Sequence, residues 1–150
     1  MPTVRLADTG DLAAVKTLVE AAYRPYIEYL GIRPGPLDDD YGEHIAQRQV
    51  HLLEERGQLC ALVVLIPEPS ALLLDNVAVS PDAQKRGHGR WLIAYAEEIA
   101  RKHGLAAIRL YTHEKMEANQ ALYRSLGFVE THRAEDKGLR RVFMTKSLAP

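Results

Sequence analysis

Apolar positions along the chain follow two spacings in turn, one typical of strands and one typical of helices. Compact or alternating apolar runs predict strands over residues 3–7, 50–55, 58–66, 71–79, 106–111, 128–132 and 139–148. Apolar residues three and four positions apart predict helices over residues 8–25, 86–103 and 117–126. Because strands and helices alternate throughout, we expect a mixed α/β fold in which helices cover both faces of one sheet.

Capping and turn residues mark the boundaries in the first third of the chain. Asp8 and Asp11 have the spacing of a capping box, so the first helix is expected to begin at Asp8. Pro25 is expected to end it. Residues 26–40 predict a short helix followed by an ordered loop, and residues 41–49 predict a second helical turn.

Length and composition are those of an ordinary globular protein. The 150 residues suit one compact domain, expected to span residues 1–150, and 47% of them are hydrophobic. The 19 lysines and arginines and 20 acidic residues give a net charge of −1, which excludes the basic excess typical of nucleic-acid-binding proteins. The apolar runs are far shorter than the roughly 20 residues of a membrane-spanning helix, and the first residues lack a signal-peptide layout. We therefore expect a cytoplasmic protein with no nucleic-acid or membrane partner.

The cysteine and histidine positions do not indicate a metal centre. The single cysteine, Cys60, excludes an internal disulfide and a cysteine-rich zinc site. It lies in the apolar run 59–66, which predicts a buried, inert thiol rather than a reactive one. The six histidines have no metal-binding spacing, so we predict no metal ion.

The clearest candidate for chemistry is a segment in which a predicted strand leads into a predicted helix. The unpaired N–H groups and the positive dipole end at a helix start attract anions. Gly87 and Gly89 would let a phosphate approach the backbone, and Lys85, Arg86 and Arg90 add positive charge. The segment is therefore an anion site or, alternatively, a plain helix start with solvated basic residues.

The glycines of this segment belong to the pattern Gln84-x-x-Gly87-x-Gly89, which follows a strand that ends in Val-x-Val-x-Pro. The sequence contains neither a P-loop nor the glycine fingerprint of dinucleotide-binding folds. The pattern instead resembles the signature of the GNAT superfamily of acyl-CoA-dependent N-acetyltransferases.

A second pattern supports this resemblance nearer the C-terminus. Tyr123 is followed four residues later by Gly127 and Phe128, as in the last block typical of that family. The two patterns occur in the family's order, and the order of strands and helices matches over nearly the whole chain. The resemblance implies a mixed, mostly antiparallel sheet of about six or seven strands, and acetyl-CoA as the acyl donor.

The resemblance also implies roles for residues at matching positions. The backbone of residues 77–79 would pair with the pantetheine amides of acetyl-CoA, and Gln84 and the amides of residues 86–90 would hold its pyrophosphate. Tyr123 would protonate the departing thiolate. The cofactor-binding residues implied in this way are Val77, Ala78, Val79, Gln84, Lys85, Arg86, Gly87, His88, Gly89, Arg90 and Asn119.

A physical argument for Tyr123 stands beside the resemblance. A phenol with a pKa near 10 and a thiol with a pKa near 8.5 are close enough for proton transfer. Asn119 lies four residues earlier, on the same face of the predicted helix. The alternative for a lone helical tyrosine is a core position with a satisfied hydroxyl.

Two positions depart from the family pattern. Met116 stands where the family often has an asparagine, and Tyr111 stands where some members carry a glutamate as general base. The general base is therefore not assigned by the resemblance, and its candidates are Asp75, His113, Glu28 and an ordered water. Asp75 ranks first because it shares a face of its strand with residues expected to contact the cofactor, although an ordinary structural carboxylate is the alternative.

Candidate residues for the acceptor lie in the first third of the chain. Tyr26, Tyr29 and Tyr41 flank the acidic run 38–40, and clustered negative charge would attract a cationic amine. The alternative for the run is a solvated loop.

The sequence thus predicts an N-acetyltransferase that passes the acetyl group of acetyl-CoA directly to a primary amine of a small molecule or peptide. The alternatives are a coenzyme A-binding regulatory module without turnover and a protein-modifying acetyltransferase. A homodimer is allowed for, since the family often dimerises and the C-terminal strand would offer an edge for pairing.

Overall fold

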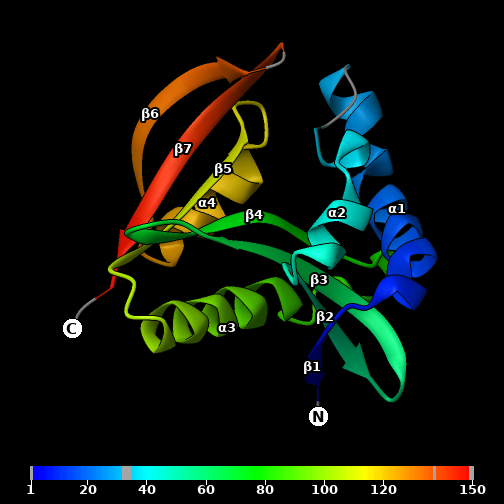
Figure 1. The fold of residues 1–150 in the computed structure, drawn as a ribbon. Helices are drawn as coiled ribbons and strands as arrows, with labels where there is room; N and C mark the ends of the chain where they lie inside the picture. Colours follow the sequence, from blue (N-terminus) through cyan, green and yellow to red (C-terminus); the bar gives the residue numbers. More distant parts are fainter. Residues whose placement is uncertain (1, 32–34, 137, 149–150) are drawn as a thin grey trace. The chain divides into compact units, whose positions relative to one another are not determined.

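The computed structural model describes residues 2–31, 35–136 and 138–148, and Figure 1 labels its helices and strands. The strands are β1 (Thr3–Leu6), β2 (Val50–Glu55), β3 (Gln58–Pro67), β4 (Ala71–Val79), β5 (Ala107–His113), β6 (Val129–Asp136) and β7 (Leu139–Ser147). The helices are α1 (Leu12–Leu30), α2 (Tyr41–Ala46), α3 (His88–Lys102) and α4 (Glu117–Ser125), with short 3-10 helices at Thr9–Asp11, Gly35–Asp38 and Pro81–Ala83. Every strand and long helix expected from the sequence is present.

The described strands form one sheet of mixed direction. Seven strands hydrogen-bond in the order β1-β2-β3-β4-β5-β7-β6. The β4–β5 pair is parallel, whereas β1–β2, β2–β3, β5–β7 and β6–β7 are antiparallel. The expected α/β class with a mostly antiparallel sheet is therefore confirmed. Internal contacts group the chain into two compact units, residues 1–65 with 76–94 and residues 66–75 with 95–150, so that β4 contributes to both.

The first unit begins with the expected capping box. The Asp8 carboxylate accepts a hydrogen bond from the Gly10 N–H at 2.9 Å, and Asp11 accepts one from the Asp8 N–H at 2.8 Å. A single 3-10 turn therefore precedes α1. Val15 and Val19 of α1, four residues apart, are buried and place this face of the helix in the core.

Pro25 lies inside α1, so the expectation that it ends the helix is wrong. Proline lacks an N–H for the carbonyl four residues earlier, but its φ is already helical, and here the chain continues for another turn. Gly31 ends the helix at φ 71°, and its N–H donates to the Ile27 carbonyl at 3.0 Å. The separate helix predicted after Pro25 is thus the last turn of α1. Of the loop predicted next, residues 32–34 lie outside the described part of the chain.

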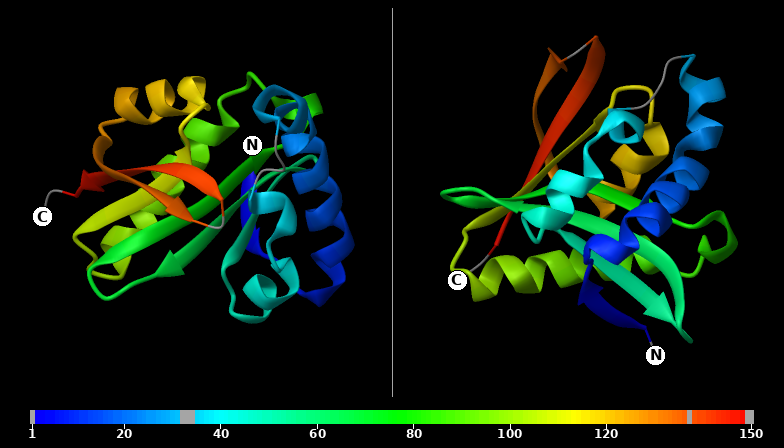
Figure 2. Two further views of the ribbon diagram at one scale, coloured as in Figure 1. Left: turned by 90° about the horizontal axis from the view of Figure 1, so that it is seen from above. Right: turned by 45° about the vertical axis from the view of Figure 1, so that its right-hand side comes forward.

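The core of this unit is built on the β2–β3 hairpin. Arg56 and Gly57 form its turn with φ values of 53° and 78°, the left-handed conformations that a tight hairpin turn requires. Fully buried apolar side chains on the two strands include Val50, Leu52, Leu53, Ala61, Leu62, Val63 and Val64. Both views of Figure 2 show α1 and α2 side by side within this unit.

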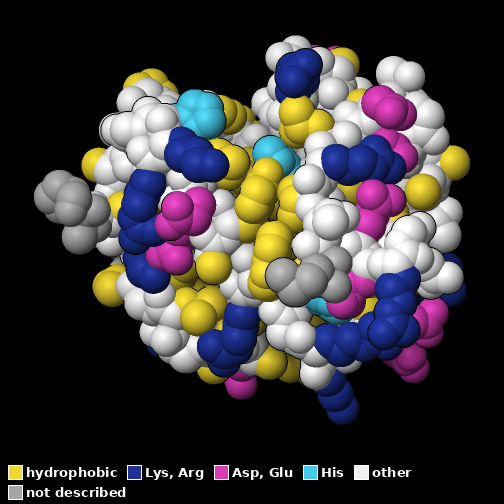
Figure 3. Space-filling model, turned by 90° about the horizontal axis from the view of Figure 1, so that it is seen from below, with side chains coloured by type: hydrophobic (Ala, Val, Ile, Leu, Met, Phe, Trp, Pro, Cys, Tyr) yellow, Lys and Arg dark blue, Asp and Glu magenta, His cyan; other side chains and the backbone are white. Residues whose placement is uncertain are grey.

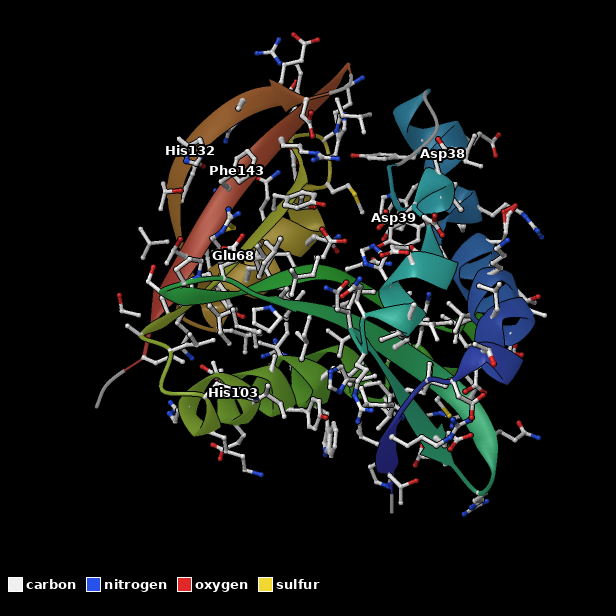
Figure 4. All side chains as sticks on the ribbon, viewed as in Figure 1. Asp38, Asp39, Glu68, His103, His132 and Phe143 are labelled. Carbon is white, nitrogen blue, oxygen red and sulfur yellow. The ribbon has the colours of Figure 1, made fainter. Side chains whose placement is uncertain are left out.

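In the second unit β7 lies between β5 and β6 and pairs with both. The C-terminal strand is therefore not a free edge, and the expectation that it offers one is wrong. The outer strand is β6, whose residues are all exposed. Figure 4 shows His132 of β6 beside Phe143 of β7, and their rings stack with centroids 4.3 Å apart. No helix in the described ranges is long and apolar enough to cross a membrane.

The capping box gives a pH-dependent contribution to stability. Hydrogen bonds from Arg5, at 2.8 and 2.9 Å, lower the pKa of Asp11 to about 2, assisted by the Asp8 backbone N–H. A lowered carboxyl pKa stabilises the fold at neutral pH, and this stability is lost as the pH falls from about 4 toward 2. We expect Asp11→Asn to cost about 1 kcal/mol of unfolding free energy at pH 7 and almost nothing at pH 2, measured by urea titration. Asp82→Asn, at an exposed position, is the control, and an equal loss at both pH values would contradict the prediction.

Candidate functional site

The end of β4 has a buried and a partly exposed side. The ladder to β5 runs from the pair Ala71–Ala107 to the pair Leu74–Leu110, whereas β4 continues to Val79. Beyond Leu74 the residues alternate in burial. Asn76 and Ala78 are buried, and Asp75, Val77 and Val79 are partly exposed. The shared strand face predicted for Asp75, Val77 and Val79 is therefore present.

A buried amide that sequence reasoning missed fixes this part of β4. Asn76 is 4% exposed, and its Nδ2 donates to the Tyr41 hydroxyl at 2.9 Å. The Tyr23 hydroxyl of α1 lies against the Asn76 side-chain oxygen and 3.1 Å from the Val77 carbonyl. The Tyr41 hydroxyl in turn donates to the Pro36 carbonyl at 2.7 Å. The signal in the sequence was a lone amide within an apolar strand.

The segment after β4 turns sharply before α3 begins. The Ser80 N–H donates to the Cys60 carbonyl at 2.8 Å, and one 3-10 turn follows. Lys85 and Gly87 then adopt left-handed backbone conformations with φ values of 66° and 81°. A Cβ added at Gly87 or Gly89 would meet no atom within 4 Å, so the backbone of this loop faces open space. Such a turn at a helix start directs several N–H groups outward and suits an anion.

The polar side chains expected around this loop differ in their placement. Gln84, Lys85, Arg86 and Arg90 are exposed, and the Gln84 Nε2 donates to the Val79 carbonyl at 3.4 Å. His88 is the exception, because its side chain is only 6% exposed. At His88 only the backbone N–H is therefore suited to a ligand in the loop.

The His88 ring lies between two acceptors within the first unit. Its Nδ1 is 3.0 Å from the Ala83 carbonyl, and its Nε2 is 2.7 Å from the Glu55 carboxylate. The Arg86 guanidinium lies 3.9 Å from the same carboxylate oxygen. These contacts tie the loop to the end of β2.

The second pattern of the sequence forms the end of α4. Tyr123 is half-buried, and its ring meets the buried Phe128 ring edge to face at 6.0 Å. The Phe128 N–H donates to the Tyr123 carbonyl at 3.0 Å across Gly127, whose φ is 99°. An added Cβ at Gly127 would also lie 3.2 Å from the Lys146 side chain. The positive φ therefore favours glycine here, since the Lys146 side chain is flexible and could shift away from a Cβ. The Phe128 ring restricts the orientation of the tyrosine ring.

Asn119 lies one turn before Tyr123 on α4. It is half-buried, and its Nδ2 lies 4.0 Å from the Met116 sulfur. The buried residue of this helix is Gln120, whose Nε2 donates to the carbonyls of His113 and Glu114 at 3.3 and 2.9 Å. Gln120 holds α4 to the end of β5, a role that the sequence did not indicate.

The candidate bases have different surroundings. Asp75 accepts a hydrogen bond from the Tyr111 hydroxyl at 2.6 Å, and the Arg141 guanidinium lies 4.2 Å from the Tyr111 ring centre. Tyr111 is the residue that stands in place of the family's glutamate. In the structure its hydroxyl therefore contacts Asp75, the first-ranked candidate for the base. Burial lowers the pKa of His113, and its Nδ1 accepts from the Lys115 N–H at 3.1 Å. Glu28 is exposed on α1.

The three tyrosines proposed for the acceptor do not share one environment. Tyr29 is 64% exposed, and Tyr26 is half-buried with its ring 6.1 Å from that of Tyr23. Tyr41 is 3% exposed and belongs to the Asn76 network, so its side chain is part of the core.

The acidic run beside them, labelled at Asp38 and Asp39 in Figure 4, is partly occupied by structural contacts. The Asp39 carboxylate lies 3.0 Å from the His44 Nε2. Asp40 caps α2 by accepting from the Glu43 N–H at 3.0 Å. The run is therefore more than a solvated loop.

Comparison with known proteins gives consistent matches. A family model described as "Acetyltransferase (GNAT) family" matches residues 15–128. The [ribosomal protein bS18]-alanine N-acetyltransferase of Escherichia coli K12 is 30% identical over 131 residues, covering 87% of this chain and 82% of that protein. The N-acetyltransferase family 8 member 3 of Rattus norvegicus is 31% identical over 84 residues, covering 52% of this chain and 37% of that protein.

Solved structures share the fold over the whole chain. The ribosomal-protein-S18-alanine N-acetyltransferase of Escherichia coli superposes with a TM-score of 0.81 at 23% identity, covering 100% of this chain and 96% of that one. The PaiA N-acetyltransferase of Thermoplasma acidophilum, in complex with coenzyme A, gives 0.80 at 19% identity, with 99% of both chains covered. A putative acetyltransferase from Salmonella typhimurium with its cofactor acetyl-CoA gives 0.74 at 22% identity, covering 100% and 95%.

The Asn76 network is expected to contribute measurably to stability. Tyr41→Phe removes the acceptor of a buried amide donor and the donor to the Pro36 carbonyl. We expect it to lower the free energy of unfolding by about 1–3 kcal/mol in a urea titration. The control Tyr29→Phe, at an exposed site, should change it by less than about 0.5 kcal/mol. Equal effects of the two variants would contradict a structural role for the network.

Proposed function

Because the chain belongs to the GNAT acetyltransferase family, we propose that it is an acetyl-CoA-dependent N-acetyltransferase that acts on the α-amino group of a peptide. Acetyl-CoA supplies the acetyl group as an activated thioester, and the acetyl group passes directly to the amine. The observation that carries the proposal is the open loop of residues 80–87 (the glycine loop), which connects β4 to α3. It offers several backbone N–H groups and three exposed basic side chains to an anion such as the pyrophosphate of coenzyme A.

In this proposal the residues around the glycine loop bind acetyl-CoA, the acetyl donor. The outward N–H groups of residues 86–90 bind the pyrophosphate, with Gln84, Lys85 and Arg90 around them. The backbone of Val77, Ala78 and Val79 pairs with the pantetheine, since β4 extends beyond its ladder to β5. Asn119 makes an additional contact to acetyl-CoA. No metal ion has a role in this reaction.

Tyr123 and Asp75 are proposed as the acid and the base. The Tyr123 phenol protonates the departing thiolate, and its ring is held by Phe128. Asp75, hydrogen-bonded by Tyr111, accepts the proton of the attacking amine.

The acceptor class follows from the energy of amine deprotonation. A lysine side chain with a pKa near 10.4 costs roughly 4–5 kcal/mol to deprotonate at pH 7, whereas an α-amino group with a pKa near 8 costs only about 1 kcal/mol. A site that carries Tyr111 in place of a glutamate base is therefore better suited to an α-amine. The Escherichia coli relative, named for a ribosomal-protein alanine, points to the same class.

The remaining features of the proposal concern the acceptor's surroundings and the state of the protein. The exposed Tyr29 and half-buried Tyr26, with the acidic run 38–40, would attract a cationic peptide end, and Tyr41 would support them from the core. Figure 3 shows basic and acidic side chains interspersed on one face, a pattern suited to a peptide rather than to a polyanion. A single domain over residues 1–150, a cytoplasmic location and a homodimer stay predictions.

Acetyl-CoA binding by calorimetry tests the donor site. We expect the wild type to bind acetyl-CoA with micromolar affinity. Gly87→Glu places a carboxylate where the pyrophosphate is proposed to bind, so we expect at least about 100-fold weaker binding by this variant. Gly138→Glu is a matched control, because Gly138 has φ 79°, close to the 81° of Gly87, and also faces open space. It should bind like the wild type. If the wild type does not bind, or both variants bind normally, the proposed donor site is wrong.

Steady-state kinetics with an alanine-initiated peptide test the acid and the base. Tyr123→Phe should lower kcat by about 10²–10⁴-fold and leave acetyl-CoA affinity unchanged. The control is Tyr95→Phe, because Tyr95 is also a half-buried helical tyrosine, in α3, and this variant should retain activity. Asp75→Asn should lower kcat/KM strongly at pH 7 and less at pH 9, where the α-amine loses its proton unaided.

Three other outcomes of these kinetics would contradict parts of the proposal. Acetyl-CoA binding without turnover of any amine would favour the coenzyme A-binding module instead. Preference for lysine side chains in peptides with a blocked N-terminus would reject the α-amine. A pH-independent loss in Asp75→Asn would leave Asp75 a structural carboxylate.

A further inference from the structure

Three potential metal ligands meet beneath the glycine loop, within the first unit. Glu55 ends β2, Cys60 lies in β3, and His88 begins α3. One ligand atom from each, the carboxylate oxygen, the thiol sulfur and a ring nitrogen, lies within 4.8 Å of the other two. Cys60 and His88 are 7% and 6% exposed, and the Glu55 side chain is 31% exposed.

The His88 ring is already oriented as in a metal site. Its Nδ1 lies 3.0 Å from the Ala83 carbonyl, so Nδ1 is the nitrogen that donates a hydrogen bond to the backbone. Metal-binding histidines almost always donate their second ring N–H in this way, which fixes the ring and directs the other nitrogen at the ion. Here the other nitrogen, Nε2, is directed at a second member of the cluster, the Glu55 carboxylate, at 2.7 Å.

We propose that Glu55, Cys60 and His88 bind one Zn²⁺ ion. A thiolate, an imidazole and a carboxylate are ligands that zinc prefers, whereas Mg²⁺ and Ca²⁺ need a full set of oxygens. Three protein ligands leave a fourth tetrahedral position. It would open on the hollow that Glu55 and Cys60 line together with Arg56, Gln58 and Arg86.

The local charges are compatible with an ion at this place. The Cys60 thiol donates to the Gln58 carbonyl, with the sulfur 3.5 Å from that oxygen. Zn²⁺ would displace this thiol proton and the proton between His88 and Glu55. The resulting thiolate and carboxylate balance the two positive charges. Two arginines, Arg56 and Arg86, also line the hollow. The Arg86 guanidinium lies 3.9 Å from the Glu55 carboxylate, and its side chain is 60% exposed and able to turn toward solvent.

This site goes beyond the proposed acetyl transfer and does not depend on it. None of the three side chains is proposed to transfer a proton in the reaction or to bind acetyl-CoA. The ion would instead stabilise the glycine loop. A metal-binding spacing is absent from the sequence because the three ligands come from separate elements, β2, β3 and α3.

Titration of the chelator-treated full chain with Co²⁺, a spectroscopic substitute for Zn²⁺, tests the proposal. The wild type should bind one equivalent and develop a sulfur-to-cobalt charge-transfer band together with the intense visible bands of tetrahedral cobalt, and Zn²⁺ should abolish both. Cys60→Ser should lose the charge-transfer band, and His88→Asn should bind at least about 100-fold more weakly. His103→Asn is the matched control, since His103 is exposed and also bonds a backbone carbonyl through Nδ1, and it should bind like the wild type.

A second measurement needs no variant. The rate at which a disulfide reagent modifies Cys60 in the wild type should fall at least 10-fold when one equivalent of Zn²⁺ is present, and Mg²⁺ should have no effect. Absence of the charge-transfer band in the wild type, or a Cys60 modification rate unaffected by Zn²⁺, would overturn the proposal. So would equal loss of binding in His88→Asn and His103→Asn.

Discussion

The buried amide of Asn76 is the interaction on which the first unit depends most directly. A buried polar side chain must find hydrogen-bond partners, and Asn76 finds them on two elements, Tyr23 of α1 and Tyr41 of α2. The amide therefore fixes the end of β4 against both helices. The glycine loop begins only four residues later, so its position follows from where this strand ends. A leucine at position 76 could occupy the space, but it would not specify which helices lie against the strand.

The strands and helices were predictable because each has a clear hydrophobic period. The predicted bounds of β2 and β4 coincide with those of the structure, since turn residues flank both runs. Pro25 was predicted to end the first helix, but α1 continues past it. Proline removes one backbone hydrogen bond, but its fixed φ is already close to the helical value. At the site, the glycine loop and the Tyr123 motif were found by their patterns. Asn76, Gln120 and the inward ring of His88 were not, because their roles depend on contacts distant in sequence.

The motif that contains Tyr123 has a structural meaning in addition to its proposed chemical one. Gly127 allows the left-handed turn that ends α4, and Phe128 returns to pack on the tyrosine ring. A catalytic phenol must be held in one orientation to be useful. Gly127 and Phe128, by which the pattern is identified, are thus also the residues that restrict the Tyr123 ring. The proposed acid and the residues that hold it therefore lie close together in the sequence.

The outer strand β6 has a consequence for behaviour at high concentration. An outermost strand presents unpaired backbone groups and invites pairing with another chain, which leads toward aggregation. The exposed strand β6 carries three carboxylates, at Glu130, Glu135 and Asp136, and one guanidinium, at Arg133. Arg133 pairs with Glu130 at 3.0 Å on the strand itself. Pairing a second such strand in register would bring like charges together and desolvate them. The composition of β6 therefore acts as a barrier to uncontrolled self-association.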